Sequence, residues 1–418
     1  MRMTYRFHGA PQLARLSLEV ESTATELRVR ASGPGALRYA GHTRFYFASL
    51  KRMRPIAILE DGSRILSLYY PPVPSAAHAR VFEDYLRTWV LHDRAPVAVT
   101  IGVTHACQCT CVHCSAGGMN AGGNGRAAQL TTAEMRRVVA ESVDIGVANV
   151  TFTGGEPLLR PDLDELVAAV PADKAVAQVF TNALLLDADR TAELKAAGLH
   201  AAQMSLDAPD ADEHDALRGV AGAFDAVRQG VRHARAAGLF VGLSTYATNE
   251  SVRAGHLTRV AALAAQWGVH ELTVFDVLPA GRLLARTDLL LTDGSRRLLL
   301  DEAAALTRRF GGRPHVITQA WTNCGRGFAR LIGCLAGNCQ FHVTASGDFA
   351  PCDFTPLAIG NVRRESVGEL WRRTVEHPAY RKHSNACRMQ SAAFRARYIE
   401  PIPEGAPLPY PIDELPPV

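Results

Sequence analysis

From Pro96 onward, short apolar runs alternate with segments in which apolar residues recur at helical spacing. This alternation is typical of repeated strand and helix units that form a parallel sheet. Strands are predicted at residues 97–103, 149–153, 177–181, 201–206, 240–246 and 271–278. The helices that follow them are predicted at residues 131–142, 162–170, 187–197, 223–237, 254–267 and 294–310. We therefore expect an α/β fold, a partial (βα)6 TIM-like barrel, with active residues at the carboxyl ends of the strands.

The two ends of the chain follow other patterns. Alternating apolar residues predict a small β-rich N-terminal domain of unknown role, with one helix at residues 77–91 and strands at 15–20, 26–30, 56–59 and 64–70. The last 18 residues contain seven prolines, which exclude a helix or central strand and favour an extended surface segment. The predicted domains are residues 1–95, 96–312, 313–400 and a Pro-rich tail at 401–418.

Composition narrows the classes of function. A chain of 418 residues that is 47% hydrophobic and 21% charged can bury a large core. A formal net charge of +4 is too small on this length to indicate a nucleic-acid partner. The N-terminus lacks the apolar stretch of a signal peptide, and no segment approaches the roughly 20 apolar residues of a membrane span. We therefore expect a cytoplasmic protein without a membrane partner.

The nine cysteines fall into two groups, which favours metal or redox chemistry in a protein of this compartment. Cys107, Cys109, Cys111 and Cys114 lie in one short loop after the first predicted strand. The spacing of Cys107, Cys111 and Cys114 favours an iron-sulfur cluster held by three thiolates. The alternatives are a structural zinc site that uses Cys109 as its fourth ligand, or buried thiols without a metal.

Two motifs in order carry a family resemblance. Cys107, Cys111 and Cys114 follow the first predicted strand, and the sequence Gly-Gly-Glu-Pro at 154–157 follows the second. Together they resemble the radical S-adenosylmethionine (radical SAM) enzymes, over roughly residues 96–400. The resemblance implies a [4Fe-4S] cluster that binds SAM and, by one-electron reduction, yields a 5′-deoxyadenosyl radical that abstracts hydrogen from a substrate. It also implies an electron donor such as flavodoxin or ferredoxin.

The resemblance further implies that the strand ends bind SAM, through Gly154, Gly155, Glu156, Pro157, Asn182, Ser205 and Asp207. The two glycines are expected to let the backbone approach the methionine amino group, and Glu156 to supply a nearby carboxylate. Asn182 and Asp207 have the alternative of capping a turn and a helix. His113 is expected near the adenine or as a polar loop residue. Arg218 is interpreted as part of a solvated face, with a contact to the SAM carboxylate as the alternative.

The second cysteine group follows residue 320. Cys334, Gly347 and Cys352, around a hairpin with Asp348 in its turn, resemble the SPASM or twitch extension that binds auxiliary iron-sulfur clusters. Five cysteines remain in this part of the chain, which predicts one auxiliary [4Fe-4S] cluster. Its expected metal ligands are Cys334, Cys339, Cys352 and Cys387. Cys324 is an alternative to Cys339 or a free thiol, and a structural zinc site is the alternative to the cluster.

The carboxylate of Asp353 follows Cys352 and matches a proton acceptor in sulfatase-maturating members of the family, which makes it the candidate catalytic base. Cys109 and Cys324 are candidate hydrogen-atom donors or buried hydrophobic residues. The leading hypothesis is a radical SAM enzyme that acts on a peptide or a small natural product. The alternatives are oxidation or epimerisation of a sugar or haem-like precursor, and an iron-sulfur electron-transfer protein that does not cleave SAM.

Overall fold

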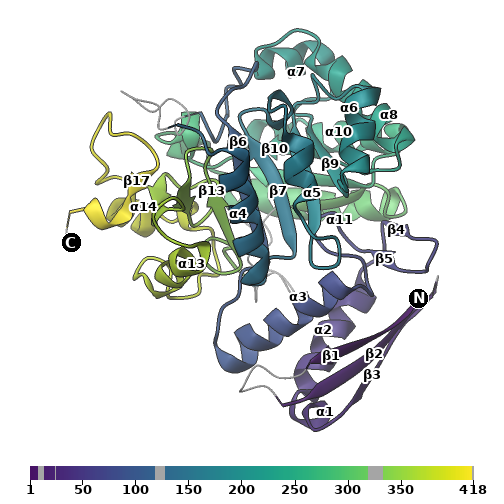
Figure 1. The fold of residues 1–418 in the computed structure, drawn as a ribbon. Coiled ribbons are helices and arrows are strands. Elements are labelled where there is room, and N and C mark those ends of the chain that lie inside the picture. The colour runs from purple at the N-terminus through teal and green to yellow at the C-terminus, as the bar shows by residue number, and fades with distance from the viewer. Residues whose placement is uncertain (8–13, 24, 118–127, 319–332, 417–418) are drawn as a thin grey trace.

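The computed structural model describes residues 1–7, 14–23, 25–117, 128–318 and 333–416 (Figure 1). Its centre is a parallel sheet whose first six strands lie in chain order. They are β6 (Ala98–Thr104), β7 (Asn149–Gly154), β8 (Val176–Thr181), β9 (Ala201–Ser205), β10 (Phe240–Ala247) and β11 (Glu271–Asp276). The predicted α/β fold with a barrel-like parallel sheet is confirmed, and each predicted strand lies within a few residues of an observed one.

The helices of this sheet begin where the sequence signals them. The Thr131 side chain accepts from the Glu134 backbone N–H and forms a capping box at the start of α4 (Thr132–Asp144). The further helices are α5 (Leu163–Ala168), α6 (Ala188–Ala196), α7 (Ala211–Arg218), α8 (Ala223–Ala236), α9 (Asn249–Arg253), α10 (His256–Trp267) and α11 (Asp293–Arg309). The short helices α7 and α9 were not predicted. Each spans at most eight residues, too few for a clear apolar period.

The sheet continues beyond both of its edge strands, β11 and β6. β12 (His315–Thr318) pairs with β11, and β13 (Gln340–Val343) pairs in parallel with β6. β14 (Asp348–Ala350) and β16 (Gly360–Asn361) then extend the same sheet in antiparallel fashion. The predicted C-terminal hairpin therefore exists, with Gly347 in the left-handed region at its turn, and it is joined to the barrel by backbone hydrogen bonds.

The rest of the C-terminal part packs around this extension. It contains α13 (Val367–Glu376), α14 (Ala392–Tyr398) and a 3-10 turn at Arg388–Gln390. The Pro-rich tail pairs only briefly, through β17 (Tyr410–Pro411) with β15 (Leu357–Ala358), and ends in a 3-10 turn at Ile412–Glu414. The remaining described residues of the tail are mostly turns and bends rather than the predicted extended segment, and, as its prolines predicted, they form no α-helix or central strand.

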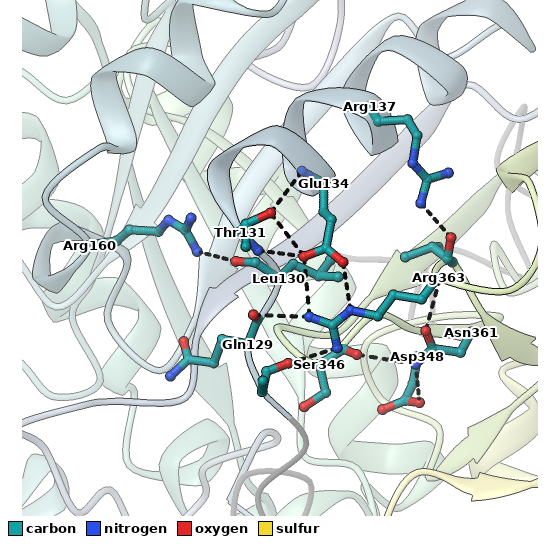
Figure 2. Close-up of polar contacts among 12 residues, drawn as sticks. Gln129, Leu130, Thr131, Glu134, Arg137, Arg160, Ser346, Asp348, Asn361 and Arg363 are labelled. Atoms are coloured by element: carbon teal, nitrogen blue, oxygen red, sulfur yellow. Dashed lines mark hydrogen bonds and ion pairs between the residues drawn. The ribbon is translucent and has the colours of Figure 1, made fainter.

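Arg363 joins this C-terminal part to the barrel (Figure 2). Its side chain donates to the carbonyl groups of Ala128 and Gln129 and pairs with Glu134 on α4, at 2.8, 3.1 and 2.7 Å. Arg160 donates to the Leu130 carbonyl from the other side. The segment that leads into α4 is thereby held between the barrel and the C-terminal hairpin.

The N-terminal unit lies at one end of the molecule (Figure 1). Its antiparallel sheet consists of β1 (Arg2–Phe7), β2 (Leu16–Ser22) and β3 (Leu27–Ser32), followed by α1 (Gly35–Arg38) and α2 (Ala40–Arg52). A two-stranded pair, β4 (Ala57–Ile58) and β5 (Arg64–Ile65), precedes α3 (Ala76–Leu86), which ends in a π turn at Arg87–Leu91.

Three expectations for this unit were wrong in detail. The sequence predicted one helix, whereas α2 is a second helix of 13 residues that buries only four of them. The predicted strand at 64–70 is reduced to Arg64–Ile65. β1 was not predicted, although its buried Tyr5 and Phe7 alternate with exposed residues as a half-buried strand requires.

Candidate active site and second cysteine site

A cavity of about 510 Å³ opens at the carboxyl ends of the barrel strands. Parallel strands bring their carboxyl ends to one edge, which explains why residues far apart in sequence meet there. Its lining includes nearly all the residues predicted for the first site: Cys107, Cys111, Cys114, Gly154, Gly155, Glu156, Asn182, Ser205 and Asp207. Pro157 is not among the lining residues. It begins the 3-10 turn Pro157–Leu159 beside the cavity.

The cysteine loop holds its thiols in contact with one another. Hydrogen bonds from the Cys109 thiol lower the pKa of both Cys107 and Cys111 to about 6. The same hydrogen bonds raise the pKa of Cys109, and burial raises that of Cys114. Cys107 and Cys111 are therefore the thiols of this loop that ionise most readily, and thiolates are the form that binds iron.

No group of three or more His, Cys, Asp or Glu side chains in the described ranges is arranged to hold one metal ion. An iron-sulfur cluster is a larger body of several iron and sulfide atoms, held by thiolates around it. The contacts within the loop fit such a body, because two ionisable thiols and a third cysteine face one cavity.

Arg218, at the end of α7, is buried against the loop, and the interpretation as a solvated residue was wrong. Its side chain pairs with Asp207 at 2.6 Å and donates to the Cys111 sulfur at 3.6 Å. A charged residue at the end of an amphipathic helix gives no sign in the sequence of a buried partner far away along the chain. Here the partner Cys111 lies 107 positions earlier.

His113 is inside the cavity and not on a polar loop surface. Its ring stacks on that of Tyr246 with centroids 3.9 Å apart, and its Nε2 lies 3.3 Å from an Asp207 oxygen. Burial lowers the pKa of His113. The stacked pair forms a flat aromatic wall of the cavity, with the neutral imidazole favoured.

The Gly154-Gly155 pair was expected to let the backbone approach the methionine amino group, and in the structure its close neighbour is the protein's own backbone. Gly154 has φ of +127°, and a Cβ there would lie 2.5 Å from the Thr104 carbonyl oxygen. A Cβ at Gly155 would overlap the Ala106 carbonyl. The Gly155 N–H also donates to the Thr104 carbonyl at 2.8 Å. The glycines thus let the start of the cysteine loop lie directly on the end of β7.

Glu156 is 1% exposed, and both its carboxylate oxygens accept hydrogen bonds from the chain. The donors are the Leu158 N–H, the Thr181 hydroxyl and the Asn182 N–H, at 3.1, 2.6 and 2.7 Å. Burial raises the pKa of Glu156 to about 7. Glu156 therefore ties the ends of β7 and β8 together at the cavity wall.

Asn182 connects this wall to the cysteine loop. Its amide donates to the Cys109 sulfur at 3.4 Å and to the Gln108 side chain at 3.3 Å. Its carbonyl also accepts from Leu184, so the turn-capping alternative holds as well. Ser205 lies one strand further on, where its hydroxyl accepts from Ser244 at 3.5 Å.

A second support of the loop, formed by the residues after β11, was not predicted. Arg282 donates to the carbonyl groups of Thr110 and Cys111, at 2.6 and 2.9 Å. Gly281 has φ of +54°, and a Cβ there would overlap the carbonyls of Cys114 and Ser115. A Pro-Ala-Gly-Arg sequence at a strand end was the available signal, since barrel strand ends face the active cavity.

The predicted auxiliary cysteines meet at a second, mostly apolar cavity of about 490 Å³. Cys334, Cys339, Cys352 and Cys387 all line it. A hydrogen bond from Cys387 lowers the pKa of Cys334 to about 5, while burial raises the pKa of the other three. One thiol that ionises readily and three further cysteines on the same cavity fit a cluster with four thiolate ligands. Cys324 lies outside the described residues.

Asp353 lies where the two cavities adjoin, since it lines both. Gln340 donates to its carboxylate at 3.3 Å, and burial raises the pKa of Asp353 to about 6. Phe275 and Phe354 also line both cavities, with ring centroids 6.1 Å apart. The candidate base therefore stands between the two cysteine sites.

A further buried carboxylate, Asp276, was missed because it lies inside the strand predicted at 271–278 and belongs to no motif, whereas the observed β11 ends at Asp276. It lines the first cavity, is 3% exposed and accepts from Gln390 at 3.2 Å. Burial raises the pKa of Asp276 to about 7. Gln390 is part of the C-terminal region, so this contact is another junction between it and the barrel.

Comparisons with known protein families agree with these two sites. Residues 101–250 match the Radical SAM superfamily, and residues 334–391 match SPASM, an iron-sulfur cluster-binding domain. The two matched segments contain the two cysteine sites, apart from Cys324. No helix in the described residues is both long and apolar enough to cross a membrane.

Individual relatives belong to more than one kind of enzyme. The AdoMet-dependent heme synthase of Nitratidesulfovibrio vulgaris is 27% identical over 70% of this chain and 83% of its own. The PqqA peptide cyclase of Streptomyces rochei is 29% identical over 69% and 78%. Among solved structures, Streptococcus suis SuiB bound to precursor peptide SuiA has a TM-score of 0.58, 16% identity, and covers 89% of this chain and 88% of that one. At that identity the structural likeness shows a shared fold.

Proposed function

This chain is a radical SAM enzyme with a SPASM domain, and from that premise we propose that it abstracts a hydrogen atom from a peptide substrate. Its cofactors are SAM, a [4Fe-4S] cluster that binds SAM, and an auxiliary iron-sulfur centre in the SPASM domain. When bound, these groups supply a 5′-deoxyadenosyl radical and a path for one electron. The remaining steps depend on the residues of this chain.

Cys107, Cys111 and Cys114 hold the first cluster in this proposal. The lowered pKa of Cys107 and Cys111 supports their role, as does the position of all three on one cavity. Cys109 is not a ligand in this proposal, which is supported by its hydrogen bonds to Cys107 and Cys111 and by the raised pKa of its thiol. Arg282 and Asn182 orient the loop from opposite sides.

The SAM-binding surface consists of the strand-end residues of the same cavity. Ser205 and Asp207 face it directly, and the stacked rings of His113 and Tyr246 provide a flat surface for an adenine. Gly154, Gly155, Glu156 and Asn182 form its wall, and Pro157 lies beside it at the start of a 3-10 turn. Their contacts to the loop support a positioning role, because displacing any of them would displace the cysteines.

One observation carries the proposal, namely that Asp353 lines both cavities. A substrate in the first cavity that reaches the second would place its reacting carbon near this carboxylate. Asp353 can then accept the proton that leaves when the substrate radical is oxidised. Cys334, Cys339, Cys352 and Cys387 would hold one auxiliary cluster that receives the substrate electron. An electron donor of the flavodoxin or ferredoxin kind would supply the first cluster.

A peptide is favoured over a small metabolite by two observations. The N-terminal unit adds a separate three-stranded sheet to the barrel. The fold match that covers 89% of this chain, a share larger than the barrel and SPASM segments together, is to a protein solved with a precursor peptide. The relatives that are heme synthases, at 25–27% identity, support oxidation of a haem-like precursor as the second candidate.

The test uses anaerobic protein reconstituted with iron and sulfide. With dithionite and SAM, we expect 5′-deoxyadenosine by mass spectrometry, and a mass change in a peptide encoded beside the gene. Asp353→Asn should retain 5′-deoxyadenosine formation and lose the peptide product. Modification of a haem-like iron porphyrin precursor with no change in any neighbouring peptide would favour the second candidate and contradict the first.

A further inference from the structure

Arg218 is a buried cation in direct contact with a cysteine of the first site. It is 9% exposed, and its Nη1 lies 3.6 Å from the Cys111 sulfur. Its Nη2 pairs with Asp207 at 2.6 Å. Its Nε is also buried and has no hydrogen-bond partner among the described residues, although the side chain lines the cavity. One N–H of this guanidinium is thus spare beside the cluster position.

The position of Arg218 is fixed by the loop itself. The Thr110 N–H donates to the Arg218 carbonyl at 2.9 Å, and the Val112 N–H donates to the Leu217 carbonyl at 3.2 Å. Gly219 follows in the left-handed region, with φ of +67°, and a Cβ there would overlap the Thr110 hydroxyl. The end of α7 and the cysteine loop are therefore one unit, and the charge cannot move away independently.

We propose that the Asp207–Arg218 pair sets the reduction potential of the cluster on this loop, with Arg218 raising the potential and Asp207 lowering it. The inference rests on the proposed ligation by Cys107, Cys111 and Cys114. Reduction adds one electron, and hence one negative charge, to the cluster. A buried positive charge and a hydrogen bond to a ligating sulfur stabilise the reduced form, and a nearby carboxylate opposes it.

The charges predict opposite shifts for the two partners. Arg218→Gln removes the cation and moves the midpoint potential to a more negative value. Arg218→Lys keeps the charge but not the fork of donors, so it moves the potential less. Asp207→Asn removes the opposing anion and moves the potential to a more positive value. A purely structural pair would give shifts of the same sign, because either substitution would break it.

The experiment is a redox titration of the reconstituted protein with dithionite, followed by electron paramagnetic resonance. A redox wave that is present in the wild type and absent from the Cys107/Cys111/Cys114→Ala variant is assigned to the loop cluster. Arg160→Gln is the matched control, because Arg160 also pairs with an aspartate, Asp162 at 2.9 Å, and contacts backbone carbonyls but no cysteine. Its potential should equal that of the wild type.

Unchanged potential in Arg218→Gln, or shifts of one sign in Arg218→Gln and Asp207→Asn, would overturn the inference. Equal shifts in Arg218→Gln and Arg218→Lys would overturn the role of charge. A wild-type protein that loads iron but shows no wave dependent on the loop cysteines would instead contradict the proposed ligation. The two failures are therefore distinguishable.

Discussion

The two cysteine sites are built in opposite ways. The first takes its thiols from one loop of eight residues, and Cys107 is exposed. The second collects Cys334, Cys339, Cys352 and Cys387 from separate segments, and Cys334 and Cys387 are 5% and 4% exposed. Two of the loop thiols ionise easily, whereas burial raises the pKa of three in the second site. An open site suits a cofactor that must bind a second molecule, and a closed site suits electron storage.

The largest expected effect separates the ligands of the loop from its remaining cysteine. Cys107/Cys111/Cys114→Ala should abolish 5′-deoxyadenosine formation, because no thiolates remain to hold the first cluster. Cys109→Ala, in the same loop, should retain it. Mass spectrometry after anaerobic reaction with dithionite and SAM measures both. If Cys109→Ala loses all the iron of the loop, Cys109 is a fourth ligand there. The loop would then not differ from the second site in its number of thiol ligands.

The second prediction removes the closed site alone. Cys387→Ala should lose about half of the bound iron, as one of two clusters fails to load. Formation of 5′-deoxyadenosine should continue, and the peptide product should disappear. Iron analysis and mass spectrometry of one preparation test this. If the second site of the wild type binds zinc in place of iron, the two sites differ in the metal that they bind as well as in the arrangement of their cysteines.

The third prediction tests the close packing beneath the loop. Gly155→Ala should destabilise the protein by about 1–3 kcal/mol and lower its iron content, because the added Cβ pushes against the Ala106 carbonyl. Gly41→Ala is the control, since nothing lies within 4 Å of a Cβ there. Thermal unfolding of the two variants gives the difference. Equal melting temperatures would mean that the loop moves away from the added Cβ without a loss of stability.

The smallest expected effect concerns Asp84, which lines the second cavity at the N-terminal unit. Burial raises the pKa of Asp84 to about 7, while an unfolded aspartate titrates at about 4. The folded state therefore retains a proton that the unfolded state has lost, and the free energy of unfolding falls as pH rises through this window.

Asp84→Asn stays neutral at every pH. It should raise the free energy of unfolding by about 1–3 kcal/mol at pH 8, with the gain disappearing towards pH 4. Asp93→Asn is the control, because Asp93 pairs with the same Arg87 at the surface. Denaturant unfolding at both pH values measures the difference. A gain of equal size at pH 4 and pH 8 would exclude buried ionisation as its source.

The sequence was informative where chemistry and periodicity are local. The strands of the barrel and the Thr131 capping box were predicted from residues close to one another in the sequence, whereas the four C-terminal cysteines that line one cavity were predicted from the family resemblance and the cysteine count. The buried ion pair of Arg218 was not, because a charged side chain next to solvent and one next to Asp207 look the same in sequence. The role of Gly155 differed for a similar reason, since its close neighbour is a loop that only the fold brings near.

Which strands and helices contact one another could also not be predicted from the sequence. An alternating run such as Gln340–Val343 identifies a strand but not the edge on which it lies. The same limit applies to α2, whose three buried apolar residues, Tyr46, Phe47 and Leu50, pack with residues of β1, β2, β3 and α3 in a small separate core. Local patterns therefore give the elements and the candidate ligands, and the contacts between distant segments decide what each ligand touches.

The pairing of β13 with β6 has a consequence for how the chain folds. Ala98 and Gln340 are partners in this ladder, so one edge of the barrel has no partner until the ribosome has made the SPASM hairpin. Contacts of such long sequence separation form slowly, and an uncovered strand edge is a template for association with other chains. The interval between synthesis of the barrel and arrival of β13 is therefore when this protein is most exposed to aggregation, and truncation before residue 340 should yield insoluble material.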